Sequence, residues 1–123
     1  KTLIEMANAA LEKSNGSVVC IEKGVKLRYE VKPQVRLVNT NEYLIFDAQA
    51  LFGFLSGLLA GNHDIETAYL DGAHRLLGKH ISEMEHFFLD LEEIAEKTDT
   101  NFVVTVSEDE SAFPEFLKKY LAE

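Results

Sequence analysis

Apolar residues recur along the chain in two patterns, one typical of helices and one typical of short strands. Residues 3–11 repeat apolar side chains at helical spacing, and Asn15-Gly16 then ends the run as a helix C-terminus would. Short apolar runs rich in β-branched residues follow at 17–22, 35–39, 67–70 and 102–106, and they predict buried strands. Residues 25–31 alternate apolar and polar side chains up to Pro33, which predicts an edge strand.

Three further helices are predicted between and after these strands. Asp47 precedes an apolar helical run and is suited to be its N-cap, and residues 82–85 (Ser-Glu-Met-Glu) match a capping box. Pro114 fits the first turn of a last helix. Strands separated by helices predict an α/β fold, with a mainly parallel sheet covered by helices on both faces. We expect residues 1–123 to form a single domain, because no linker or repeat interrupts them.

The most apolar stretch, residues 44–60, is shorter than the roughly 20 residues of a bilayer span and contains Asp47 and Gln49. Gly53 and Gly57 have the G-x-x-x-G spacing that favours helix dimerisation in membranes. In a soluble chain the same spacing lets a helix lie close against a sheet. We therefore interpret this stretch as a buried helix and expect no membrane span.

The charge and cysteine content narrow the function classes. Lys and Arg number 12 against 21 Asp and Glu, for a net charge of −9, which disfavours nucleic acid as the main ligand because phosphate contacts need clustered cations. The single cysteine, Cys20, lies in an apolar run, so it predicts a small buried hydrophobic residue and not a nucleophile. The absence of a possible disulfide framework indicates a reducing, cytoplasmic location.

Candidate residues for phosphate chemistry occur where the predicted helices and strands begin or end. Lys1-Thr2 directly precede a helix and match the last two residues of the phosphate-binding motif G-x-x-x-x-G-K-[ST]. Asp71 ends a buried strand, the pattern that places a carboxylate beside the Mg²⁺ of a phosphate-loop nucleotidase. An Asp-Gly turn is also common for turn reasons alone. Ser107 ends the next strand, where it could sense a terminal phosphate or lie in a solvated loop.

A resemblance covers essentially the whole chain and is most specific at the segments FGFLSGLLA and FVVTVS. The chain resembles a family of small ATP-binding proteins of low-GC Gram-positive bacteria, which are often labelled twitching-motility ATPase-like. The family resembles the RecA-type phosphate-loop (P-loop NTPase) fold and opens with a strand and a G-[TS]-G-K-T-like loop. The resemblance implies ATP and Mg²⁺ as ligands, and it leaves open whether Lys1 and Thr2 are the motif's own pair or follow it.

The expected fold therefore lacks its first strand in this sequence. The strand before a phosphate loop normally lies inside the sheet, so its absence would leave a slot and expose the edges of apolar strands. We expect about 10–15 residues before Lys1, the length of a short strand and a glycine-rich loop.

These patterns together assign candidate roles. Asp71 and Ser107 are the expected catalytic residues, and Lys1, Thr2, Asp71 and Arg75 the expected nucleotide-binding residues, with Thr2 and Asp71 on the metal. Arg75, with His74, could instead be a surface loop residue. Glu22, at the end of a strand, could orient a water, although a turn role beside Lys23 is favoured.

A second cluster of polar residues gives a weaker metal signal. Glu83-x-x-His86 matches half of a di-metal bundle motif, with His80 close by, but a solvated helix face is favoured because the motif occurs once.

Two function classes remain open. The first is an ATP-binding domain with slow Mg²⁺-dependent hydrolysis, slow because Gly72 stands where many hydrolysing relatives place a glutamate. The second is a non-catalytic interaction or regulatory module that docks a protein partner through its acidic surface.

Overall fold

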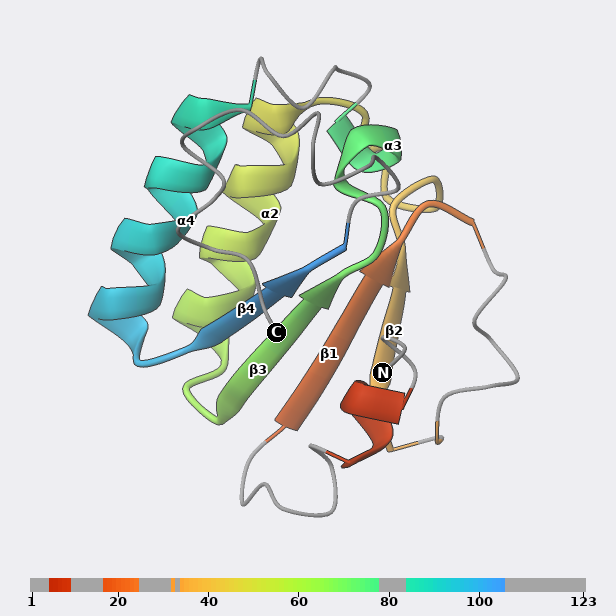
Figure 1. Cartoon of the computed structure of the whole chain (residues 1–123), viewed down its shortest axis with the longest axis vertical. Helices are drawn as coiled ribbons and strands as arrows, with labels where there is room; N and C mark the ends of the chain where they lie inside the picture. Colours follow the sequence, from red (N-terminus) through yellow and green to blue (C-terminus); the bar gives the residue numbers. More distant parts are fainter. Residues whose placement is uncertain (1–4, 10–16, 25–31, 33, 78–83, 106–123) are drawn as a thin grey trace, which may run out of the picture.

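The computed structural model describes residues 5–9, 17–24, 32, 34–77 and 84–105. Four strands form one sheet in the order β2-β1-β3-β4, and every neighbouring pair is parallel (Figure 1). The strands are β1 (Ser17–Glu22), β2 (Arg36–Asn39), β3 (Ile65–Leu70) and β4 (Asn101–Val104). The prediction of an α/β fold with a parallel sheet is confirmed, because all three strand pairs are parallel and helices lie between β2 and β3 and between β3 and β4.

Helical residues lie on both faces of the sheet. The apolar side chains of β1 point alternately to the two faces, so both faces must be covered. Val19 and Ile21 face the larger core, which α2 (Ala48–Gly61), α3 (Ala73–Leu77) and α4 (Glu85–Thr98) complete. Val18 and Cys20 face the opposite way, into a smaller core that contains Ala7 of the helical residues 5–9. Successive strand residues point to opposite faces of the sheet, so odd-numbered apolar residues of β1 pack in the larger core and even-numbered ones in the smaller core.

The helical residues 5–9 are attached to the smaller core by two hydrogen bonds. The Tyr69 hydroxyl donates to the Met6 carbonyl at 3.1 Å, and the Lys32 amide donates to Asn8 Oδ1 at 2.9 Å. The predicted first helix is thus confirmed over residues 5–9, and the rest of it lies outside the described residues.

The predicted capping of α2 is confirmed and that of α4 is wrong. Asp47 is the N-cap of α2, and its Oδ1 accepts from the Ala50 amide at 2.7 Å. Helix α4 begins at Glu85, with Met84 as an N-cap that makes no side-chain capping bond. A capping box would make Glu85 the third helical residue instead of the first, and Ser82 lies outside the described residues.

The interpretation of the two glycines of α2 is also wrong. Gly53 and Gly57 are exposed, and a Cβ built on either one would meet no atom within 4 Å. Helix α2 packs on the sheet through Leu51, Leu55 and Leu59 instead, which are buried at intervals of four residues. These glycines therefore do not bring α2 closer to the sheet.

The described strands leave no slot between them. Strands β1 and β3 are each hydrogen-bonded on both sides, so any further strand would add beside β2 or β4. The predicted strand at residues 25–31, Pro33 and the last helix with Pro114 lie outside the described residues. No helix in the described part of the chain is long and apolar enough to cross a bilayer.

Candidate functional site

The carboxyl ends of the four strands carry a row of polar residues, one from each strand. Glu22 pairs with Asn39 across β1 and β2, and Ile21 pairs with Leu70 across β1 and β3. The ladder continues one residue further, because the Asp71 amide donates to the Ile21 carbonyl at 2.9 Å. On the other side the Thr105 amide donates to the Leu70 carbonyl, also at 2.9 Å. We call the residues at this level the polar row: Asn39, Glu22, Asp71 and Thr105, in the order of the strands.

The polar row lies on the face that carries the helical residues 5–9. Each member comes two positions after a residue that packs in the smaller core: Leu37, Cys20, Tyr69 and Val103. Because strand side chains alternate with a period of two, all four polar side chains share that face. The sequence brings them together because each strand ends at the same edge of a parallel sheet, where ligands of such sheets bind.

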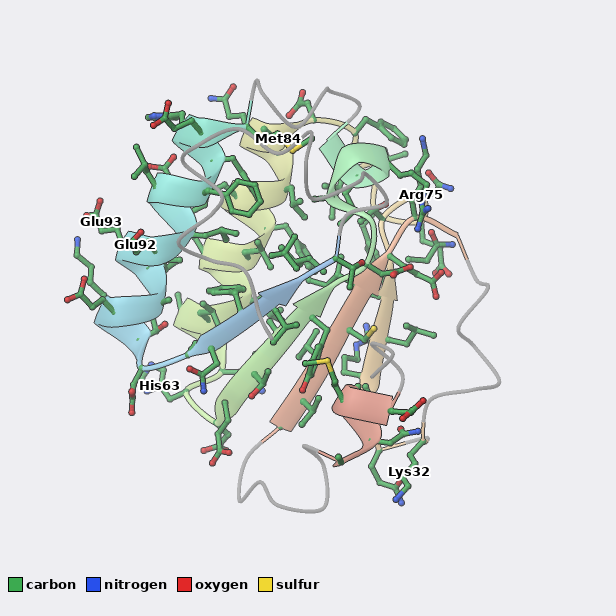
Figure 2. The ribbon with its side chains drawn as sticks, viewed as in Figure 1. Lys32, His63, Arg75, Met84, Glu92 and Glu93 are labelled. Atoms are coloured by element: carbon green, nitrogen blue, oxygen red, sulfur yellow. The ribbon has the colours of Figure 1, made fainter. Side chains whose placement is uncertain are left out.

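Asp71 accepts a hydrogen bond on each of its carboxylate oxygens. Its Oδ1 accepts from the Thr105 hydroxyl at 3.1 Å, and its Oδ2 accepts from the Arg75 guanidinium at 3.2 Å. The Asp71 side chain is 14% exposed and that of Arg75 is 38% exposed. Figure 2 shows Arg75, a residue of α3, at the carboxyl edge of the sheet. The carboxylate is thus nearly buried, oriented on both oxygens and open to solvent on a narrow side.

Gly72 makes this arrangement possible. It has a φ of 72°, a conformation that L side chains rarely adopt, and a Cβ built there would lie 2.6 Å from Arg75 Cζ. Its amide donates to the Thr105 hydroxyl at 2.8 Å, and the Ala73 amide donates to the Thr105 carbonyl at 2.9 Å. A glutamate at position 72 would therefore displace the guanidinium from Asp71.

Glu22 is a strand residue, so its interpretation as a turn residue is wrong. Its side chain is fully buried, and its carbonyl accepts from the Thr40 amide at 2.9 Å. Asn39 holds the turn after β1 instead, since its Oδ1 accepts from the amides of Gly24 and Asn41 at 2.9 and 3.0 Å. The row therefore contains two carboxyl groups on adjacent strands, those of Glu22 and Asp71.

Cys20 comes two residues before Glu22 in β1, on the same face of the sheet as these carboxyl groups. Burial raises its pKa to about 12, and the negative charges of Asp71 and Glu22 add to this increase. The prediction that Cys20 is a buried apolar residue is confirmed, because a thiol with so high a pKa is not a nucleophile near neutral pH.

The structure brings together two of the residues expected at the site, Asp71 and Arg75. Lys1, Thr2 and Ser107 lie outside the described residues, as does the side chain of His74. Sequence reasoning missed Thr105, which takes the position beside Asp71 expected for Ser107, because β4 ends at Val104 and not at residue 106. Thr105 is the polar residue inside the apolar run 102–106, and this interruption was the available signal.

The second metal signal, Glu83-x-x-His86, finds no support among the described residues. His86 is exposed on α4 and pairs with Asp90 at 3.3 Å, while His80 and Glu83 lie outside the described residues. No group of three or more His, Cys, Asp or Glu side chains within the described ranges is arranged to hold a metal ion.

The polar row nevertheless suits a magnesium ion that arrives with phosphate. Mg²⁺ prefers oxygen ligands and is usually held by one or two carboxylates, with phosphate oxygens and water completing its shell. Asp71 offers carboxylate oxygens and Thr105 a hydroxyl that already orients Asp71, while the carboxyl group of Glu22, on the next strand, is fully buried. Arg75 adds a cation beside the same place. The donor set thus fits Mg²⁺ bound to an anionic ligand better than a metal held by protein alone.

Comparison of the chain with protein-family models, with curated proteins and with solved structures finds no match.

Proposed function

We propose that this protein is a P-loop NTPase of RecA-like type that binds ATP with Mg²⁺ at the polar row and hydrolyses it slowly, as a molecular switch or small ATPase. The observation that supports this most is the pair of carboxyl groups, Asp71 and Glu22, on adjacent parallel strand ends, with Arg75 beside them. Ligands of open parallel sheets bind at this edge.

Each residue of the row has a part in the proposal. Asp71 orients the ligands of the metal, and the Thr105 hydroxyl holds the Asp71 carboxylate in place. Bound Mg²⁺ would neutralise charge on the outer phosphates. Glu22 accepts a proton from the attacking water. Gly72 cannot take this role because it has no side chain. Turnover is slow in this proposal because the Glu22 carboxyl is fully buried and water reaches it only when the site opens.

Three further residues keep the roles expected from the sequence as proposals. Lys1 contacts the outer phosphates, Thr2 contributes a hydroxyl to Mg²⁺, and Ser107 senses the terminal phosphate.

A second candidate function is a non-catalytic module that docks a protein partner. The loop between β2 and α2 favours it, because Tyr43, Leu44 and Phe46 are 50%, 73% and 57% exposed. Leu44 has a φ of 59°, a conformation that is costly for a leucine and persists where surrounding structure enforces it. Exposed apolar side chains on such a loop are typical of interaction sites.

Calorimetric titration of ATP into the natural full-length protein, with and without Mg²⁺, tests the proposed function. We expect Mg²⁺ to strengthen ATP binding and Asp71→Ala to reduce that Mg²⁺-dependent gain more than it reduces metal-free binding. Asp90→Ala is the matched control, since it removes the same charge from α4 and leaves the polar row intact. Absence of any nucleotide binding by the wild-type protein would refute the proposal and favour the docking module.

A further inference from the structure

We propose that Arg75 is a latch on Asp71, which keeps free Mg²⁺ out of the site until the phosphates of a nucleotide draw the guanidinium away. The inference rests on the proposed function and adds a regulation to it: metal and nucleotide are taken up together. The geometry that points to it is the contact of Arg75 with Oδ2 of Asp71, while Thr105 donates to Oδ1.

Both oxygens of Asp71 already have a hydrogen-bonding partner. Thr105 donates to Oδ1 at 3.1 Å, and Arg75 donates to Oδ2 at 3.2 Å. A metal ion that binds Oδ2 would therefore share that oxygen with the guanidinium and stand close to its positive charge. The Thr105 hydroxyl is also held by the Gly72 amide at 2.8 Å, whereas Arg75 is a partly exposed side chain, so the guanidinium is the more easily moved of the two partners.

The latch is built into the backbone between Asp71 and Arg75. The two residues are four apart, and the chain between them turns at Gly72 with a φ of 72°. The Arg75 guanidinium lies where a Cβ of residue 72 would be, with its Cζ 2.6 Å and its Nε 2.9 Å from that position. Only glycine leaves this space, so residue 72 both forms the turn and admits the latch.

The exposed fractions of Asp71 and Arg75 allow the guanidinium to hold the carboxylate and also to move away from it. The Asp71 side chain is 14% exposed, so its contact with Arg75 is only partly screened by water. The Arg75 side chain is 38% exposed, so it can rotate outward without unpacking the core. A divalent cation placed on Asp71 would stand beside this positive charge and be repelled by it.

Phosphate groups would remove the repulsion between Arg75 and a metal ion on Asp71. A nucleoside triphosphate brings several negative charges to the carboxyl edge, and a guanidinium binds phosphate oxygens in a bidentate manner. Once Arg75 turns to the phosphates, its positive charge no longer stands on Oδ2 of Asp71, and anionic oxygens separate the guanidinium from the metal. Metal and nucleotide should therefore bind with positive coupling, and each should strengthen the other by the same factor.

The test compares Mn²⁺ binding in the full-length wild type and in Arg75→Gln, because Mn²⁺ takes the same oxygen ligands and its free form is counted directly by electron paramagnetic resonance. Gly72→Ala is a second variant, which keeps the arginine but pushes it off Asp71. Arg36→Gln is the matched control, since it removes the same charge from the start of β2. ATP binding without metal is measured for each protein by calorimetry.

We expect Arg75→Gln and Gly72→Ala to bind Mn²⁺ alone about two- to fivefold more tightly than wild type, the range for a partly exposed ion pair. We expect Arg75→Gln to bind metal-free ATP more weakly and to show a smaller coupling between metal and nucleotide, with Arg36→Gln unchanged. Equal Mn²⁺ affinity and equal coupling in Arg75→Gln and wild type would overturn the latch while the site stands. Absence of both Mn²⁺ and ATP binding from every protein would instead overturn the proposed function and the latch with it.

Discussion

Thr105 joins the end of β4 to the turn after β3, and its hydroxyl is predicted to be a measurable part of the stability of the fold. The hydroxyl accepts from the Gly72 amide at 2.8 Å and donates to Asp71 Oδ1 at 3.1 Å. Thr105→Val keeps the shape of the side chain and removes both bonds. The substitution thus isolates the hydroxyl, without a cavity or a change of strand propensity.

The magnitude follows from what the two partners lose. Gly72 is buried, so its amide left without an acceptor costs about 1–2 kcal/mol. Asp71 loses one charge-assisted bond, but water reaches its 14% exposed side chain and replaces part of that bond, which leaves about 1 kcal/mol. We therefore expect Thr105→Val to lower the free energy of unfolding by about 2–3 kcal/mol, and the melting temperature by about 10 °C.

Urea unfolding followed by circular dichroism measures this difference, with equal m-values for the two proteins as the condition for comparing them. Thr105→Ser is the control, because it keeps the hydroxyl and should lose at most about 1 kcal/mol for the methyl group. In an Asp71→Asn background the cost of Thr105→Val should fall by about 1 kcal/mol, since the charged acceptor is gone. A loss below about 0.5 kcal/mol, or an equal loss for serine and valine, would refute the reasoning.

Three further predictions concern other parts of the fold. Asp47→Ala should lower the free energy of unfolding by about 1 kcal/mol, because the Ala50 amide at the start of α2 loses its 2.7 Å acceptor. Leu44→Gly should leave stability unchanged or raise it by about 0.5 kcal/mol in a thermal melt, since relief of the strain at φ 59° offsets the added chain entropy. The Cys20 pKa of about 12 lies above the ordinary value of 9.0, so the folded state disfavours the thiolate. Unfolding free energy should be unaffected below pH 9 and fall between pH 9 and 12 by about 1.4 kcal/mol per pH unit.

Each of these predictions has a control. Asp47→Ser keeps an N-cap oxygen and should retain most of the stability that alanine loses. Leu44→Ala cannot relieve the backbone strain, so a gain seen with alanine as well as glycine would contradict the explanation. Cys20→Ala should make the alkaline loss shallower without removing it, because burial also raises the pKa of Tyr69. An unchanged slope in Cys20→Ala would show that another group causes the loss.

The sheet was predictable from sequence because its signals are local. Four apolar runs predict the strands, and the helical segments between the second and third runs and between the third and fourth predict crossovers of a parallel sheet, which the structure has. Asp47 was predictable for the same reason, since an N-cap acts on an amide three residues away. The capping box at residues 82–85 shows the limit of such motifs, because the packing of Met84 in the larger core fixes where α4 begins.

The site was only half predictable because its contacts join residues far apart in the chain. Asp71 and Arg75 are four residues apart and follow a strand, so their pattern is visible in sequence. Thr105 is 34 residues from Asp71, and its place depends on where β4 stops pairing with β3. The burial of Glu22 depends on strands on both sides of it, so no local pattern separates it from a turn residue.

The strand order also has a consequence for the chain as it leaves the ribosome. Strand β1 lies inside the sheet, yet it ends at Glu22 and its neighbour β3 does not begin until Ile65. At a synthesis rate of about 5–20 residues per second, β3 follows about 2–9 s later. During that interval one edge of β1 has no β3 beside it, and Val18–Ile21, an apolar segment, can pair with another nascent chain. Slowing translation between residues 22 and 65 should therefore increase aggregation more than slowing it after β4.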